Sequence, residues 1–211
     1  MAAKPETEQE AFWRGAFGDE YTERNADERL VEANIALFRR ILERAPRVRS
    51  IVELGCNRGL NLKALASVDP SLALSAYEIN AGAAKLASAL GVAQVHCASI
   101  LDLDLGAIEP SDLAFTKGVL IHIGPDDLER AYAALTALAR RYVMVCEYYN
   151  PTPVTVSYRG ASERLFKRDF AGELMDRHGL TLVDYGFVYH RDPRVPQDDL
   201  TWFLMEKRPA S

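Results

Sequence analysis

A short glycine turn holds the residues of this chain whose types and spacing most clearly indicate chemistry. The turn reads Glu53-Leu54-Gly55-Cys56-Asn57-Arg58-Gly59 and closes an apolar run that is typical of a buried strand. Glycines at such a point let the backbone approach a ligand closely, and the helix that follows presents free backbone N–H groups. The turn therefore predicts a ligand site at the end of a strand.

The spacing within the turn excludes two common nucleotide sites and favours a different ligand. A dinucleotide fingerprint needs G-x-G-x-x-G, but Glu53 stands at the first glycine position and Arg58 at the third. A P-loop needs a Gly-Lys-Ser/Thr ending, and Arg58-Gly59-Leu60 lacks it. The Glu53 carboxylate would repel a diphosphate and suit a ligand with ammonium and sulfonium charges. We therefore expect S-adenosylmethionine (SAM) as the cofactor.

Residues after the next strands extend this candidate cofactor site. Glu78 ends the following strand, about twenty residues beyond the glycines, where a carboxylate can accept both ribose hydroxyls. Ile100 could pack on adenine and Ser99 could bond its edge. The core residues expected at the cofactor are Glu53, Gly55, Cys56, Asn57, Gly59, Glu78, Ile79, Ser99, Ile100, Lys117 and Gly118. The alternative is that Glu53 and Glu78 are ordinary strand-end acids.

Methyl transfer from a sulfonium is an in-line displacement, so the protein must mainly align acceptor, methyl group and sulfur. A hydroxyl acceptor would also need a base for its proton. His122 is the leading candidate, because it follows the fourth expected strand and an imidazole titrates near a pH of about 6.5. Glu147 and Tyr148 could supply a second base or an orienting hydroxyl. A structural histidine, or a carboxylate acceptor that needs no base, is the alternative.

Basic residues gather late in the chain, between Arg159 and Arg168. This stretch is either a solvated face or part of a lid over the acceptor, whose cations would bind a carboxylate or phosphate. The residues expected at the acceptor are Tyr149, Tyr158, Arg159 and Lys167. The three cysteines and the other histidines lack metal-ligand spacing, so we expect no metal.

Apolar periodicity predicts the strands and helices that would position these residues. The expected strands cover residues 50–55, 73–79, 93–97, 113–116 and 142–148. The expected helices cover 27–44, with Asp27 as N-cap, 60–68, 81–90, about 126–141 and 169–178. Two last strands, 180–189 and 200–206, have no helix between them and should pair antiparallel.

The order of elements predicts an α/β fold with helices on both faces of a seven-stranded, mostly parallel sheet that ends in an antiparallel hairpin. This arrangement resembles the Rossmann-like class I methyltransferases. Neither a linker nor a repeat divides the chain, so residues 1–211 should form one domain.

The composition limits the partners of this domain. A net charge of −5 removes the positive field on which non-specific nucleic-acid binding relies. The sequence contains neither an apolar run of about 20 residues nor an N-terminal secretory signal. We expect a cytoplasmic monomer or homodimer with a small-molecule acceptor and with neither nucleic acid nor membrane as a partner.

Three strings outside the glycine turn resemble the pseudaminic-acid-biosynthesis-associated methyltransferase family, over nearly the whole chain. They are residues 12–25 (FWRGAFGDEYTERN), residues 116–123 (TKGVLIHI), and Tyr158-Arg159-Gly160 followed by residues 166–170 (FKRDF). The resemblance implies methyl transfer to a small, anionic or sugar-like metabolite of nonulosonic-acid type.

The resemblance also implies that an N-terminal segment, residues 1–26, lies over the cofactor of a core formed by residues 27–211. Tyr21 and Arg24 would then hold the methionine carboxylate. Trp13 would belong to the same wall, although the four-residue spacing of Trp13, Phe17 and Tyr21 also suits plain packing.

Two other functions compete with this interpretation. One is a SAM-binding or regulatory protein without turnover. The other is a nucleic-acid methyltransferase, which the charge and the absence of an Asn/Asp-Pro-Pro-Tyr/Phe string disfavour.

Overall fold

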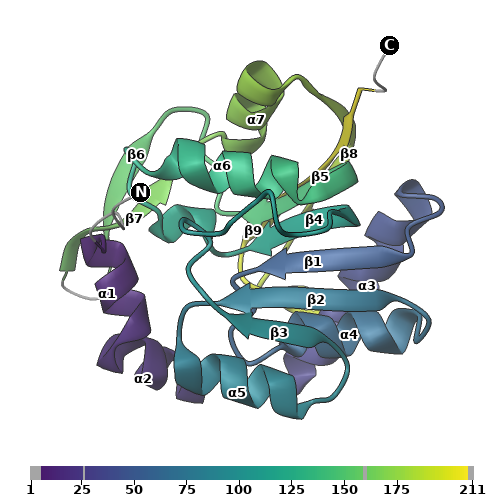
Figure 1. Cartoon of the computed structure of the whole chain (residues 1–211), viewed down its shortest axis with the longest axis horizontal. Coiled ribbons are helices and arrows are strands. Elements are labelled where there is room, and N and C mark those ends of the chain that lie inside the picture. The colour runs from purple at the N-terminus through teal and green to yellow at the C-terminus, as the bar shows by residue number, and fades with distance from the viewer. Residues whose placement is uncertain (1–5, 26, 159–160, 209–211) are drawn as a thin grey trace.

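A seven-stranded sheet organises the protein (Figure 1). The computed structural model describes residues 6–25, 27–158 and 161–208, with the backbone alone at 156–158 and 161–164. The strand order is β3-β2-β1-β4-β5-β9-β8. Five strands are mutually parallel: β1 (Ser50–Leu54), β2 (Ala73–Glu78), β3 (Gln94–Cys97), β4 (Ser111–Lys117) and β5 (Ala139–Glu147).

The last two strands reverse the direction of the sheet. β9 (Leu200–Lys207) runs antiparallel to both β5 and the edge strand β8 (Leu180–Val188). The predicted fold, a mostly parallel sheet that ends in an antiparallel hairpin, is thus confirmed. The strands in the middle of the sheet are buried on both faces and have apolar side chains on each.

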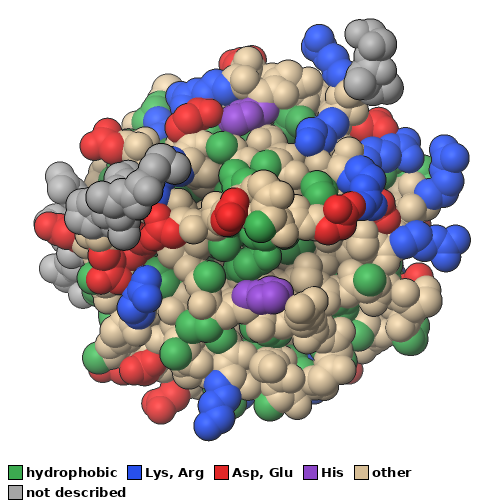
Figure 2. Space-filling model, viewed as in Figure 1, with side chains coloured by type: hydrophobic (Ala, Val, Ile, Leu, Met, Phe, Trp, Pro, Cys, Tyr) green, Lys and Arg blue, Asp and Glu red, His purple; other side chains and the backbone are tan. Residues whose placement is uncertain are grey.

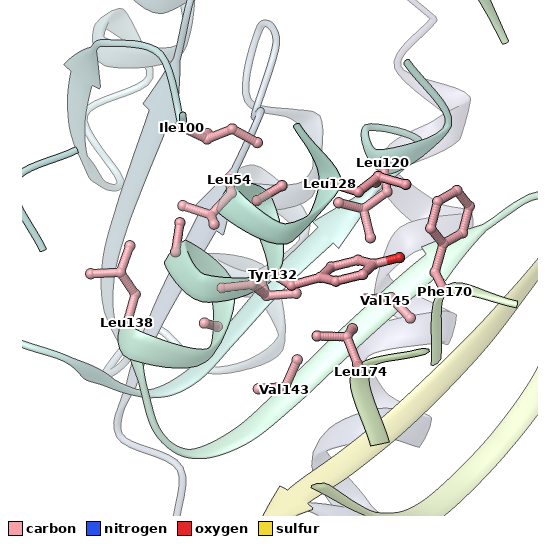
Figure 3. Packing of buried hydrophobic residues seen from close by; sticks show 14 of the residues in the cluster. Leu54, Ile100, Leu120, Leu128, Tyr132, Leu138, Val143, Val145, Phe170 and Leu174 are labelled. Carbon is pink, nitrogen blue, oxygen red and sulfur yellow. The ribbon is translucent and has the colours of Figure 1, made fainter. Parts of the chain in front are cut away.

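Helices cover both faces of the sheet, each over its own apolar cluster. The helices α3 (Arg29–Arg44), α4 (Leu60–Val68) and α5 (Ala81–Ala89) contribute Phe38, Leu65 and Ala87 to one cluster. The helices α6 (Leu128–Ala137) and α7 (Phe170–His178) contribute Tyr132 and Leu174 to the other (Figure 3). Burying these side chains stabilises the domain by roughly 1.5–3 kcal/mol for each large one.

The carboxyl ends of the parallel strands point toward two short N-terminal helices, α1 (Glu8–Arg14) and α2 (Ala16–Arg24), as the arrowheads in Figure 1 show. A 3₁₀ turn, η1 (Leu120–His122), follows β4 at the same edge. Ligands of open α/β sheets bind outside the carboxyl ends of the strands. The fold therefore places its candidate site between the sheet edge and the N-terminal helices.

Several predicted boundaries were wrong. The helix expected to reach residue 141 ends at Ala137, and the next strand already begins at Ala139. Charge pairing explains the early strand, since Arg140 bonds Glu109 and Asp112, and Arg141 bonds Glu206 of β9. The N-cap of α3 is Glu28, and not Asp27 as was predicted. The Asp27 carboxylate instead accepts hydrogen bonds from the backbone and side chain of Arg29.

The basic stretch forms a structure that the sequence did not predict. β6 (Val154–Tyr158) and β7 (Ala161–Lys167) pair antiparallel in a separate two-stranded sheet. β7 lies against η1, next to the candidate site. The run predicted as a solvated face or an acceptor lid is therefore a hairpin beside the sheet edge.

Within the described ranges, no helix has the length and apolar character needed to cross a membrane. The same residues contain no cluster of three or more His, Cys, Asp or Glu side chains that could hold a metal ion.

Candidate functional site

The glycine turn adopts the backbone geometry that its sequence requires. Gly55, Asn57 and Gly59 all have positive φ, at 85°, 46° and 84°. A Cβ atom on Gly55 would lie 2.6 Å from Cγ2 of Val119, in the loop after β4. Only glycine permits this approach without a shift of the Val119 side chain. Gly59 is the N-cap of α4, whose first backbone N–H groups are therefore free of helix partners.

A cavity of about 210 Å³ lies at the carboxyl ends of β1 to β4, walled on one side by α1 and α2. Neighbouring strands are about 4.8 Å apart, so these four ends span roughly 14 Å. The predicted site residues that line the cavity are Trp13, Tyr21, Gly55, Cys56, Asn57, Glu78, Ile79, Ser99, Ile100, Lys117, Gly118 and His122. Four strand ends, η1 and the N-terminal segment thus meet at one space.

Glu78 faces the cavity from the end of β2, as its position in the sequence predicts. Its two carboxylate oxygens accept bonds from the backbone N–H groups of Asn57, at 2.7 Å, and Asn80, at 2.8 Å. Burial raises the pKa of Glu78, and these N–H bonds oppose the rise. The side chain therefore ties the glycine turn to the start of α5 and still borders the cavity.

Glu53 lies below the cavity wall, with no exposed surface. Asn61 donates to one of its oxygens at 2.6 Å, and the other oxygen has no hydrogen-bond partner. Burial raises the pKa of Glu53 to about 8, against the smaller opposing effects of Asn61 and Lys117. The carboxyl group is then mostly uncharged at pH 7, which corrects the expectation that its charge repels a diphosphate.

The N-terminal segment contacts three of the loops that form the cavity floor. The Thr22 hydroxyl donates to Asn57 Oδ1 at 2.8 Å, within the glycine turn. Asn80 donates to Asp19 at 2.8 Å and caps α5. Glu10 accepts the hydroxyl of Ser99, in the loop after β3. Sequence reasoning missed these partners, although the Thr7-x-x-Glu10 capping box was a recognisable signal.

Arg24 takes no part in the cavity wall. Its guanidinium lies on the exposed side of α2, 3.4 Å from Glu20 and over the Phe17 ring. In this position the Arg24 guanidinium does not reach the cavity, so the geometry does not support the expected contact with a cofactor carboxylate. Among the described residues, the cations that line the cavity are Arg58 and Lys117. Arg58 donates to the Thr22 carbonyl at 3.2 Å, which adds a contact between α2 and the turn.

His122 and Trp13 form one wall of the cavity. Their ring centroids are 4.5 Å apart, and Trp13 also packs edge-on against Phe17 and Tyr21. His122 is 8% exposed and lines the cavity, so its ring is buried yet borders the space where an acceptor would enter. Trp13, Phe17 and Tyr21 therefore pack against one another, and two of them, Trp13 and Tyr21, also line the cavity.

Glu147 lies behind this wall rather than in it. Its carboxylate is buried and accepts the backbone N–H groups of Val119, at 3.0 Å, and Leu120, at 3.1 Å. Burial raises the pKa of Glu147 to about 7, and these two bonds oppose the rise. The geometry assigns Glu147 to holding η1, which carries His122. This placement corrects the expectation of a second base that reaches the acceptor.

Two of the residues expected at the acceptor, Tyr149 and Lys167, lie beside the cavity, near β6 and β7. Lys167 Nζ is 4.9 Å from the centroid of the Tyr148 ring, which is half-buried against both apolar clusters. Tyr149 is exposed and packs on Phe203. The backbone of Tyr158 belongs to β6, and Arg159 lies outside the described residues. Neither Tyr149 nor Lys167 lines the cavity itself.

Comparison with known proteins gives matches at the level of structure alone. No family's sequence profile matches the chain, and no curated protein matches it. The resemblance to the pseudaminic-acid-associated family therefore stays a prediction.

Solved methyltransferase structures superpose on almost the whole chain. The 1,6-didemethyltoxoflavin-N1-methyltransferase of Burkholderia thailandensis, with its substrate and S-adenosylhomocysteine (SAH) bound, has a TM-score of 0.69 at 19% identity, over 98% of this chain and 93% of its own. Magnesium protoporphyrin IX methyltransferase from Synechocystis, with SAH, gives 0.69 at 12% identity, over 94% and 97%. A SAM-bound amino pentose methyltransferase from Micromonospora echinaspora gives 0.64 at 14%, over 91% and 96%. The chain has the class I methyltransferase fold.

Proposed function

We propose that this protein is a SAM-dependent methyltransferase that acts on a small molecule. The observation that carries the proposal is one cavity in which the glycine turn, the Glu78 carboxyl group and the His122 ring all face the same space. The close backbone approach at Gly55 and the acid at the end of β2 fit a nucleoside with its ribose on Glu78. When bound, SAM supplies an electrophilic methyl group.

Local charge supports SAM over a dinucleotide. A diphosphate at this turn would lie beside the carboxyl group of Glu78, which bonds the turn and lines the cavity. Lys117, at the end of β4, is positioned to hold the carboxylate of an amino acid. The similar structures with bound SAM or SAH add support from outside the chain.

The wall formed by Trp13 and His122 is where we place the acceptor. Trp13 offers a flat apolar surface, and His122 can accept the proton of a hydroxyl as the new bond forms. Glu147 keeps this ring in position through the two backbone N–H groups of its loop. Holding acceptor and methyl group in line is worth up to about 7–11 kcal/mol, so alignment is the main task of the wall.

An anionic or sugar-like acceptor is the class to test first. The family resemblance suggests it, and the β6–β7 hairpin next to η1 could supply cationic contacts such as Lys167. The three similar proteins are named as methyltransferases of magnesium protoporphyrin IX, of 1,6-didemethyltoxoflavin and of an amino pentose, and so support a small acceptor in general.

The test is turnover with candidate acceptors. Purified protein, SAM and a panel of nonulosonates, their nucleotide-linked forms, and other small hydroxyl, amine and carboxylate compounds are incubated together. Mass spectrometry should detect a gain of about 14 Da on one acceptor, with one equivalent of SAH. Tight SAM binding without SAH formation across the panel would favour a regulatory binding protein instead. Retention of NADH but not SAM in equilibrium dialysis would refute the proposal.

A further inference from the structure

A buried carboxylate enters the cavity from the N-terminal helix α1. Glu10 is 6% exposed and lines the cavity beside the loop after β3. One of its oxygens accepts the Thr7 backbone N–H at 2.8 Å, and the other accepts the Ser99 hydroxyl. Burying a carboxylate without partners costs free energy. Its position in the cavity therefore suggests that Glu10 contacts a ligand.

Glu10 is ionised in this setting and has capacity for further bonds. Burial would raise its pKa, but the hydrogen bonds from Ser99 and Thr7 outweigh burial and lower it. A carboxylate offers about four lone-pair sites on its two oxygens. Thr7 and Ser99 use part of this capacity, so the carboxylate still has room for a donor on a ligand.

The order of the strands fixes which part of a nucleoside would reach Glu10. β3 is the outermost parallel strand, one position beyond β2, which carries Glu78. A ribose bonded to Glu78 would direct its base toward the loop after β3, because β1 and the glycine turn lie on its other side. Ile79, Ile100 and Leu101 line that end of the cavity and offer apolar surface to a flat ring.

We propose that Glu10 recognises the exocyclic amino group of the adenine and thereby selects an adenine nucleoside over a 6-oxo purine. This inference rests on the proposed function, and it gives α1 a role in specificity. An amino N–H can donate to the Glu10 carboxylate. A hypoxanthine base has a carbonyl oxygen at the same position. This oxygen and the Glu10 carboxylate are both acceptors, so neither would have a hydrogen-bond donor.

The experiment compares two ligands in three proteins by isothermal titration calorimetry. The ligands are SAH and its deaminated analogue S-inosylhomocysteine, which has a 6-carbonyl. We expect the native protein to prefer SAH by about 100-fold or more, because buried polar groups reject mismatched partners strongly. Glu10→Gln should reduce this ratio at least about tenfold, because its amide can donate to a carbonyl. Glu23→Gln, an exposed change on α2, should leave the ratio unchanged.

A second variant separates base recognition from anchoring of the helix. Ser99→Ala removes the hydroxyl that joins the loop to Glu10 but keeps the carboxylate, so the preference for SAH should persist even if both affinities fall. Thermal unfolding without ligand checks that the variants are folded. An unchanged ratio in Glu10→Gln, with SAH still bound, would overturn the inference and leave the proposed function intact. Failure of the native protein to bind SAH would overturn both.

Discussion

His122 is the residue whose position most directly suggests a chemical step. Its ring borders the cavity and packs on Trp13, while Glu147 holds the turn that carries it. We predict that His122→Ala lowers kcat by about 10²- to 10⁴-fold, the usual contribution of a general base, and leaves the Kd for SAM nearly unchanged. Steady-state kinetics with calorimetry would measure both.

The control for this variant is His96→Asn. His96 packs on Tyr77 at β3, and it does not line the cavity, so its replacement should leave kcat unchanged. Full turnover by His122→Ala would remove the base role and point to an acceptor that is already ionised, such as a carboxylate.

The buried Glu53 predicts a dependence of stability on pH. Its folded pKa of about 8 exceeds the usual value of 4.5, because the fully buried carboxyl group loses its hydration. A group with a raised folded pKa stabilises the fold below its unfolded pKa, and this contribution disappears as pH rises through the folded value. Stability should therefore decline between about pH 4.5 and 8.

Glu53→Gln would imitate the protonated acid and remove this contribution. We predict that from pH 5 to pH 8 the native protein loses free energy of unfolding relative to Glu53→Gln, on the order of 1–3 kcal/mol. Urea denaturation at both pH values would measure the difference. Glu23→Gln, on the exposed face of α2, should follow the native curve. Parallel curves for Glu53→Gln and the native protein would show that the buried acid does not titrate in this range.

The helices α1 and α2 are joined by hydrogen bonds to the loops that follow β1, β2 and β3 and border the cavity. The Thr22 hydroxyl is buried and lies 2.8 Å from both Asn57 Oδ1 and the Gly18 carbonyl. Thr22→Val keeps the shape but leaves the Asn57 oxygen without this donor, at a cost of about 1–3 kcal/mol. We predict roughly a tenfold weaker Kd for SAM and faster hydrogen exchange over residues 8–24.

Thr136→Val is a matched control for that change. Thr136 is also a buried helical threonine, and its hydroxyl likewise lies 2.8 Å from the carbonyl four residues earlier, but it lies in α6 away from the cavity. Its replacement should leave SAM affinity unaltered. Equal effects of the two variants on affinity would mean that the bond to Asn57 has no special link to the cofactor site.

The β6–β7 hairpin carries a separate prediction about the acceptor. Lys167 projects from β7 over the Tyr148 ring, beside η1. If the hairpin contacts an anionic acceptor, Lys167→Glu should raise the acceptor KM several-fold through charge repulsion and leave SAM binding unchanged. Lys85→Glu, an exposed reversal on α5, is the control for net charge. An unchanged KM would exclude Lys167 from acceptor binding.

Local sequence patterns were sufficient to predict the units in which a strand is followed by a turn and a helix. The helix over residues 60–68 and the glycine turn before it agree with the structure, because apolar spacing and glycine act within a few residues. The strands β6 and β7 were missed: residues 154–158 (VTVSY) do alternate as a half-buried strand does, but the charged run 161–167 (ASERLFK) does not, so the sequence showed no partner strand. The helix over 126–141 was overextended, because the ion pairs of Arg140 and Arg141 join separate strands.

The difference between local and long-range interactions also explains which residues of the candidate site could be predicted. Gly55, Glu78 and Ser99 were found because each lies at or just after the end of a strand, and parallel strands end at one edge. Glu10, Asn80 and Thr22 were missed as contacts, since their bonds join residues 89, 61 and 35 positions apart. Spacing along the chain cannot show such pairs.

At the scale of the whole molecule, the distribution of charge agrees with a small-molecule partner. The chain has a net charge of −5, and the face in Figure 2 carries both acidic and basic side chains. Many of the basic groups are already paired, as with Arg130 between Asp102 and Asp127. With this net negative charge, binding to a nucleic-acid backbone would lack its main driving force.

Because the cavity is built from four strand ends and the N-terminal helices, a ligand that fills it should stabilise the entire domain. SAM at 100 times its Kd would add about 2.7 kcal/mol to the free energy of unfolding. For a domain of this size, each kcal/mol raises Tm by about 2–4 °C, so a shift of roughly 5–11 °C is expected. NADH at the same concentration should give little or no shift, because its diphosphate would lie beside Glu78. Differential scanning fluorimetry measures both, and a larger shift with NADH than with SAM would contradict the assignment of the cofactor.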